Sequence, residues 1–237
     1  MKIAVINGSM RHGSTWQCVD LIMKEIARVE ETEITEFFLP RDMPHFCCGC
    51  FSCFFNGEDT CPHAESVQPI AEALLNADLI VLNSSVYALD VTGQMKTLLD
   101  HLCYQWMSHR PNPRMFNKVA LTVVTTAGAG LSHATKTLRN SLRFWGVKRI
   151  HSFKGAVAAA KWSEVTEKNQ AKIKKQTAKL ARRIARDVKN AKQLPSPLIR
   201  NILMKAMAGA MHKYENWNPR DLQYWESNNW FKGVNRP

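Results

Sequence analysis

The sequence lacks any apolar run approaching the roughly 18 residues that a membrane-spanning helix requires. It also lacks internal repeats and low-complexity linkers, and its first segment turns polar after Ile6, unlike a secretory signal peptide. Acidic side chains are few, at 20 against 32 Lys and Arg, so the formal net charge is +12. With 45% hydrophobic and 22% charged residues, the composition excludes a disordered chain and a collagen-like repeat. We expect a cytoplasmic protein whose seven cysteines are thiols or metal ligands rather than disulfides.

The excess positive charge is confined to one part of the chain. Residues 1–160 carry 15 basic and 14 acidic side chains, whereas residues 161–193 carry 11 basic and 3 acidic ones. Helical periodicity over 163–192 gives this basic segment a narrow apolar stripe. A basic stripe is also typical of nucleic-acid or membrane-surface binding. We favour a solvated outer helix and no nucleic-acid partner, because this helix stands where the last helix of the fold is expected.

The hydrophobic pattern predicts an α/β fold. Short apolar runs at 2–7, 33–39, 77–83, 118–125 and 149–158 alternate with segments of helical spacing at 14–29, 67–75, 92–106, 131–145 and 163–192. Strands that are apolar on both faces and alternate with helices are typical of a parallel sheet covered by helices on both sides. We therefore predict five parallel strands in a doubly wound domain over residues 1–193.

Residues 194–237 are predicted to form a C-terminal helical extension. Pro195 and Pro197 end the basic helix, and a second amphipathic, Met-rich helix follows over 198–214. We interpret it as a dimer-forming or self-packing arm, since methionine suits adaptable contacts. The remaining stretch, 217–237, has little periodicity, and we expect a packed tail.

The loop after the first strand is suited to binding a phosphate. It reads GSMRHGST and offers the hydroxyls of Ser9, Ser14 and Thr15, the side chain of Arg11 and the amides of a following helix. It lacks the lysine of a nucleoside-triphosphate loop, and the Gly-x-Gly-x-x-Gly dinucleotide pattern is absent. We therefore expect a monophosphate ligand. The alternative is a hydroxyl-rich helix cap with no ligand.

Two further loops follow strands at the edge where ligands bind in such sheets. Residues 83–90 and 125–130 could hold a flat heteroaromatic ring between them, with Tyr87 against the ring and glycine backbone near its polar edge. Taken singly, Tyr87 could be an ordinary core-edge aromatic and the glycines a plain turn. With the phosphate loop, they describe both ends of flavin mononucleotide (FMN). The predicted ring contacts are Ser85, Val86, Tyr87, Ala88, Thr125, Thr126, Ala127 and Gly128.

These motifs resemble those of the flavodoxin-like NAD(P)H-dependent oxidoreductases, also called NADPH-dependent FMN reductases. The matching segments are GSMRHGST, ADLIVLNSSVYALDVTGQMKTLLDHL and TTAGAG, within residues 1 to about 155. The resemblance implies strand order 2-1-3-4-5, FMN, and a homodimer or homotetramer. It also implies NAD(P)H as co-substrate and a small electron acceptor such as a quinone or free flavin. No catalytic side chain is predicted, because the flavin supplies the chemistry. Ser85 departs from the family, which usually has proline there.

A cysteine-rich loop is the other strong signal. Cys47, Cys50 and Cys53 are spaced by two residues, and Cys61 follows with Pro62 directly after it. Closely spaced thiolates with a fourth can hold one iron–sulfur cluster. The pattern also resembles the motif of the iron–sulfur flavoproteins, in which a [4Fe–4S] cluster exchanges electrons with FMN.

Three alternatives to a cluster-bearing enzyme stay open. The loop could be a cluster-free lid near the flavin, as in relatives with a similar cysteine pattern, or it could bind zinc, which suits such close spacing less well. The protein could also be an electron-transfer module without a substrate of its own. Cys48 has no role in the cluster scheme, and we assign Cys18 and Cys103 to the core.

Overall fold

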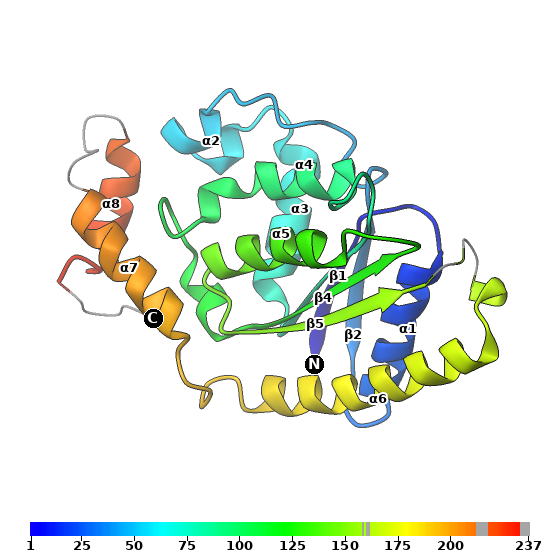
Figure 1. Cartoon of the computed structure of the whole chain (residues 1–237). Helices are drawn as coiled ribbons and strands as arrows, with labels where there is room; N and C mark the ends of the chain where they lie inside the picture. Colours follow the sequence, from blue (N-terminus) through cyan, green and yellow to red (C-terminus); the bar gives the residue numbers. More distant parts are fainter. Residues whose placement is uncertain (158, 160–161, 212–217, 233–237) are drawn as a thin grey trace.

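The computed structural model describes residues 1–157, 159, 162–211 and 218–232. Its centre is one sheet of five parallel strands in the order β2-β1-β3-β4-β5, which confirms the predicted flavodoxin-like topology (Figure 1). The strands are β1 (Lys2–Asn7), β2 (Glu33–Phe38), β3 (Leu79–Ser85), β4 (Val119–Thr126) and β5 (Arg149–Ala156). Residue 158, the predicted end of the last strand, lies outside the described residues.

Helices cover both faces of the sheet. Helices α1 (Ser14–Ala27) and α6 (Glu167–Lys189) pack on one face. The other face is covered by α3 (Ala64–Asn76), α4 (Gly93–His101) and α5 (Leu131–Phe144). The helix predicted over 92–106 is shorter than expected: it ends at His101 and continues as a 3₁₀ turn, Cys103–Gln105. The basic helix α6 has the predicted outer position, with Ile173 and Ile184 buried and most of its lysines exposed.

Strand alternation supplies two separate cores. In β1, Ile3 and Val5 pack among the residues of α1 and α6, whereas Ala4 and Ile6 pack on the opposite side. The expectation that every strand is apolar on both faces is wrong for β2. Four of its six residues are exposed and two are half-buried, because β2 is an edge strand.

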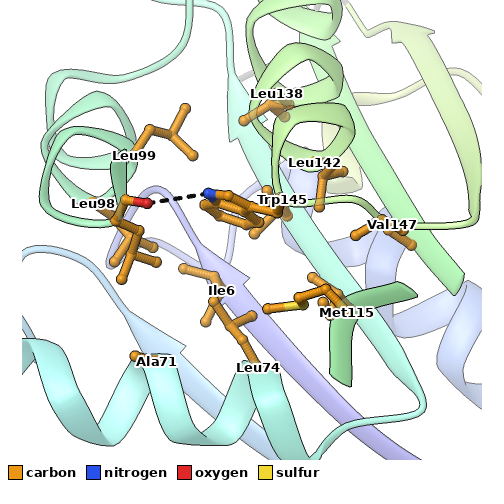
Figure 2. Packing of buried hydrophobic residues seen from close by; sticks show 14 of the residues in the cluster. Ile6, Ala71, Leu74, Leu98, Leu99, Met115, Leu138, Leu142, Trp145 and Val147 are labelled. Carbon is orange, nitrogen blue, oxygen red and sulfur yellow. Dashed lines mark hydrogen bonds between the residues drawn. The ribbon is translucent and has the colours of Figure 1, made fainter. Parts of the chain in front are cut away.

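Among the described residues, Trp145 is one of three tryptophans buried in the core on the α3–α5 side. It is fully buried where α5 ends, and Figure 2 shows it among Leu98, Leu142 and Val147. Its indole Nε1 donates a hydrogen bond to the carbonyl oxygen of Leu102 at 3.3 Å. The apolar ring is therefore packed while its polar atom is paired, so burial of this large ring leaves no unsatisfied donor.

The C-terminal extension contains α7 (Leu198–Met211) and α8 (Pro219–Ser227). The expected packed tail contains a helix, α8, that was not predicted: Pro219 stands in its first turn, and the Asn218 side chain accepts a hydrogen bond from Asp221 N at 3.3 Å. Residues 212–217 and 233–237, which include the predicted end of α7 and parts of the tail, lie outside the described residues.

The buried face of α7 only partly matches the apolar stripe in its sequence, which runs through Ile199, Ile202, Leu203, Met207 and Met211. Arg200, Met204, Ala208 and Met211 are buried, whereas Ile199 and Ile202 are exposed. Met204 and the α8 residue Trp225 belong to the same core as α3, α4 and α5, so the arm packs on its own chain. Among the helices of the described ranges, none combines the length and the apolar character needed to cross a bilayer.

Trp225→Ala tests whether the extension stabilises the whole domain. Loss of this fully buried ring should lower the free energy of unfolding by about 3–5 kcal/mol. We expect one cooperative transition in urea, monitored by circular dichroism, with its midpoint lowered. The control Leu198→Ala changes a side chain that is 74% exposed and should stay within about 0.5 kcal/mol of wild type. Two separate transitions would instead place residues 194–237 in a unit of their own, as the predicted division at residue 193 allows.

Candidate functional site

The loops that follow β1, β3 and β4 are joined by hydrogen bonds at the carboxyl edge of the sheet. Asn83 Nδ2 donates to Asn7 Oδ1 at 2.6 Å, and Gly8 N donates to Asn83 O at 2.9 Å. Thr92 Oγ1 then donates to Gly8 O at 2.7 Å. A Cβ at Gly8 would lie 2.8 Å from Thr92 Oγ1, so only glycine lets the loop pass this close. The strand ends and the turn after β1 are therefore held as one unit.

A group of hydroxyls lies above this unit. Thr15 Oγ1 is 2.7 Å from Ser85 Oγ and 2.5 Å from Thr125 Oγ1, so side chains from α1, β3 and β4 meet in one network. Ser85 is the residue that replaces the family's usual proline, and its hydroxyl supplies one of these links. Each hydroxyl has one proton and two lone pairs, which leaves capacity to bond a ligand as well.

The N-terminus of α1 points its amides toward the same place. Gly13 precedes the helix, and no side chain caps the first turn. Orphan amides at a helix N-terminus favour an anion. The backbone of the preceding turn is held by a bond from Arg11 N to Ser9 Oγ at 3.2 Å, and the Arg11 side chain is exposed. The Ser14 hydroxyl was expected to be a free donor, but it donates a hydrogen bond to Ala159 O at 3.2 Å.

A cavity of about 410 Å³ opens at this edge. Nine of the twelve residues predicted to bind FMN line it: Arg11, Ser14, Thr15, Ser85, Val86, Tyr87, Thr125, Thr126 and Ala127. Ser9 lines a small adjoining pocket with Arg11, Thr15 and Ser85. Ala88 and Gly128 are exposed and line neither cavity. The three loops identified from the sequence thus form one concave site.

Sequence reasoning missed part of the wall. Val157, Ala159 and Glu164 line the larger cavity, and Asn83 and Trp16 line the smaller one. The signal for the first three was available, because β5 ends at the same edge as β3 and β4, and the segment after it must pass the site. The contribution of Trp16 depends on how α1 is rotated, which its apolar spacing does not specify at the first turn.

The loop after β3 has a strained shape that a glycine in the next loop accommodates. Ala88 and Leu89 both have positive φ, at 47° and 68°, and Tyr87 N donates to Asp90 O at 2.8 Å to close the turn. Gly130, with φ of 93°, lies against this turn: a Cβ there would be 2.6 Å from Val86 Cγ1 and 2.9 Å from Leu89 O. The loops after β3 and β4 therefore fit together only with glycine at position 130.

The cysteine loop follows β2 and ends at α3, with the short helix α2 (Ser52–Phe55) inside it. Cys47 and Cys50 are exposed, while Cys53 and Cys61 are half-buried. Burial, and after it the charges of Cys61, Cys47 and Cys50, raise the pKa of the Cys53 thiol to about 11. The charges of the other three predicted ligands thus reach Cys53, and all four cysteines lie on this one loop. Cys18 is buried in the core on the α1–α6 side as expected, and Cys103 is half-buried against the core on the other face of the sheet.

Histidines adjoin this thiol group. One ligand atom each of Cys61, His63 and His101 lies within 4.8 Å of the others, an arrangement that could hold a metal ion. His101 Nε2 is 3.0 Å from His45 O, and burial lowers the pKa of the His101 imidazole. His63 stacks on His45 with ring centroids 4.8 Å apart. No motif in the sequence indicates this grouping, because His63 and His101 are 38 positions apart.

A buried ion pair ties the cysteine loop to the C-terminal extension. The Arg110 guanidinium bonds Asp221 of α8 and also donates to the carbonyl oxygens of Cys53 and Phe54. Both charged side chains are almost fully buried, and His109 Nδ1 lies 2.8 Å from Asp221 Oδ2. Helix α8 thereby fixes the arginine that holds α2 in place.

Comparison with known proteins agrees with this geometry. The model of one protein family, described as NADPH-dependent FMN reductase, matches residues 1–164. The chain belongs to this family. The resemblance stated from the loops is thus confirmed at the level of the family.

Curated relatives bear on the resemblance to the iron–sulfur flavoproteins. An iron–sulfur flavoprotein of Archaeoglobus fulgidus is 28% identical over 149 residues, which cover 62% of this chain and 64% of the relative. An iron–sulfur flavoprotein of Methanocaldococcus jannaschii is 28% identical over 153 residues, 65% of this chain and 70% of that protein. The match thus spans less than two thirds of the first relative's length.

Solved structures share the fold. An NADH:FMN oxidoreductase in its apo form has a TM-score of 0.52 at 18% identity, covering 83% of this chain and 91% of that one. An FMN-dependent NADH-azoreductase of Bacillus anthracis in complex with FMN has a TM-score of 0.54 at 12% identity, covering 76% and 100%. At these identities the likeness extends to the fold alone.

Gly130→Ala tests whether the two loops must fit together. The positive φ and the contact with Val86 should lower the free energy of unfolding by at least about 1 kcal/mol. Gly128→Ala is the matched control, because a Cβ there meets no atom within 4 Å and its φ is ordinary. Thermal unfolding of both variants measures the effect. Equal stability of the two variants would show that the loop contact is unimportant.

Proposed function

We propose that this protein oxidises NADH or NADPH at FMN and passes the electrons to a small acceptor such as a quinone or a free flavin. The supporting observation is the cavity of about 410 Å³ at the carboxyl edge, lined from three loops by residues suited to the two ends of FMN. When bound, FMN would accept hydride from the nicotinamide and release electrons to the acceptor. The side chains serve to bind and orient it.

The phosphate end of FMN fits the loop after β1. Arg11 supplies a positive charge at the rim, and the amides of the first turn of α1 have no side-chain cap. Ser9, Ser14 and Thr15 add hydroxyls around the same point. A dianionic phosphate would replace the caps that α1 lacks and would extend the hydroxyl network.

The ring end fits between the loops after β3 and β4. Val86 and Tyr87 line one side of the cavity, and Thr125, Thr126 and Ala127 line the other. Ala88 and Gly128 lie in the same loops, where backbone atoms could bond the polar edge of the ring. Tyr87 is half exposed, so its ring is available to cover a ligand.

Arg11→Ala should weaken FMN binding. Loss of a charge-assisted hydrogen bond to phosphate should cost about 1.5–3 kcal/mol of binding free energy. Isothermal titration of flavin-free protein with FMN measures this change. Arg28→Ala is the control, because Arg28 is exposed at the far end of α1 and pairs with Glu25. If Arg11→Ala binds FMN as tightly as Arg28→Ala, the phosphate does not bind this loop.

A [4Fe–4S] cluster on Cys47, Cys50, Cys53 and Cys61 is the second part of the proposal. The mutual influence of these thiols on the Cys53 pKa supports one shared site, and relatives of this chain are named iron–sulfur flavoproteins. The cluster would supply one-electron transfer when bound. The chain's own residues would supply the four thiolates, with Arg110 holding the backbone of Cys53.

Cys50→Ser should remove most of the iron from anaerobically purified protein, because four thiolates hold a cluster as a unit. Cys48→Ser is the matched control and should retain the iron, since Cys48 is an exposed thiol outside the predicted set. Iron, zinc and acid-labile sulfide analysis with a visible spectrum measures the outcome, and FMN should remain in both variants. Zinc without sulfide would favour a site that uses Cys61, His63 and His101. Protein without any metal would leave the loop as a lid.

Turnover discriminates an enzyme from an electron-transfer module. Rapid NAD(P)H oxidation with a quinone favours the proposed enzyme, whereas slow turnover by a brown, iron-containing preparation favours a carrier.

We also propose a homodimer or homotetramer. Phe46, Phe51 and Phe55 are exposed on the cysteine loop, where a second protomer would cover them. Light scattering of the purified protein gives the number of protomers.

A further inference from the structure

A second, strongly cationic cavity lies at the opposite edge of the sheet from the flavin site. It has a volume of about 230 Å³ and is lined where α5 ends, β5 begins and α7 begins. Figure 1 places α7 on the side where β4 and β5 begin, away from their arrowheads. Because β5 has eight residues, roughly 23 Å of strand separates this cavity from the carboxyl edge.

Among the described residues, the lining of this cavity carries five positive charges and no negative one. Aspartate and glutamate are absent from its lining residues, and the cations are Arg139, Arg143, Lys148, Arg149 and Arg200. The nearest described acid is Asp187, whose carboxylate is 3.0 Å from His151 Nε2, 3.3 Å from Arg186 Nη2 and 3.9 Å from Arg149 Nε. One carboxylate shared by three partners cannot neutralise this cavity.

Arg200 is the most informative of these residues. It is only 3% exposed, and its Nε has no hydrogen-bond partner among the described residues. Its other nitrogens donate to Phe116 O at 2.7 Å, Gly146 O at 3.0 Å and Ser196 Oγ at 2.7 Å, all uncharged acceptors. A buried guanidinium normally has an anionic partner. Within the described residues, no carboxylate pairs with Arg200.

The neighbouring lysine adds to the imbalance. Burial and the charge of Arg200 both lower the pKa of Lys148, which is itself buried. Its Nζ donates to Asn117 Oδ1 and to Lys192 O, each at 3.1 Å, so Lys148 also lacks a carboxylate partner. Two buried cations that repel each other are destabilising unless an anion lies between them.

We propose that this cavity is a binding site for a phosphate group, separate from the flavin. An arginine guanidinium can donate two parallel hydrogen bonds to two oxygens of one phosphate. A phosphate dianion also neutralises more of the five positive charges than a single carboxylate does. The source is either a free phosphorylated molecule or the headgroup of an anionic lipid. Ile199 in the wall, with Leu198 and Ile202 exposed on the same turns of α7, would lie against the organic part of either one.

The test uses FMN-loaded protein, so that the flavin phosphate loop is already filled. The double variant Arg143→Gln, Arg149→Gln removes two cations whose side chains reach solvent and should leave the fold intact, as circular dichroism can verify. Its matched control is Lys172→Gln, Lys175→Gln, which removes the same charge from exposed positions of α6. Inorganic pyrophosphate and vesicles of phosphatidylglycerol or phosphatidylcholine are the probes, at constant ionic strength.

Wild type and control should bind one of the two anionic probes, either pyrophosphate or phosphatidylglycerol vesicles, and should not bind phosphatidylcholine vesicles. The Arg143, Arg149 variant should bind the same probe at least tenfold more weakly. Pyrophosphate binding without vesicle binding identifies a free phosphorylated ligand, and vesicle binding identifies the lipid headgroup. The proposal is overturned if wild type binds neither probe. It is also overturned if both double variants lose affinity equally, since the effect would then be one of net charge, and Arg200 would serve only to bond the carbonyls of Phe116 and Gly146.

Discussion

The pairing of Asn7 with Asn83 is the interaction on which the functional edge of this protein depends. These two buried amides stand at the carboxyl ends of adjacent strands and face each other in the sheet register. Asn7 also donates to Glu36 Oε1 at 2.8 Å, which extends the tie to β2. A one-residue slip of β3 would turn Asn83 to the other face and separate the loops. The hydroxyl network and the cavity above it both require this register.

Much of this edge could be predicted from the chain, because each strand–loop–helix unit is local in sequence. The apolar runs fix the strands, and strands that run parallel must bring Ser9, Ser85 and Thr125 to one edge. The segment after β5 was missed because Val157 and Ala159 have small apolar side chains with no polar group to indicate a ligand. They line the cavity only because of where the chain places them. Helix α8 was missed because its stability comes from the cap at Asn218 and from the burial of Trp225, which periodicity over nine residues does not specify.

Amphipathic spacing predicted α7 correctly but only part of its buried face: Met211 is buried and Leu203 and Met207 pack on the core as expected. The apolar residues Ile199 and Ile202 dominate a stripe in sequence, yet the buried face includes Arg200. The guanidinium finds three uncharged oxygen acceptors and stacks over the Phe116 ring at 5.3 Å. Hydrogen bonding and ring contact thus outweigh the apolar count, and only tertiary structure reveals such partners.

The Arg110–Asp221 pair also has a consequence for the order in which the protein matures. The cysteine loop leaves the ribosome more than 150 residues before Asp221, the buried partner of Arg110, which holds the carbonyl oxygens of Cys53 and Phe54; Glu58, the loop's own partner of Arg110, is exposed. Until α8 is made, that arginine lacks its buried counter-charge and the loop lacks its final support. Completion of the thiol site is therefore a late event, which follows synthesis of α8 rather than synthesis of the loop itself.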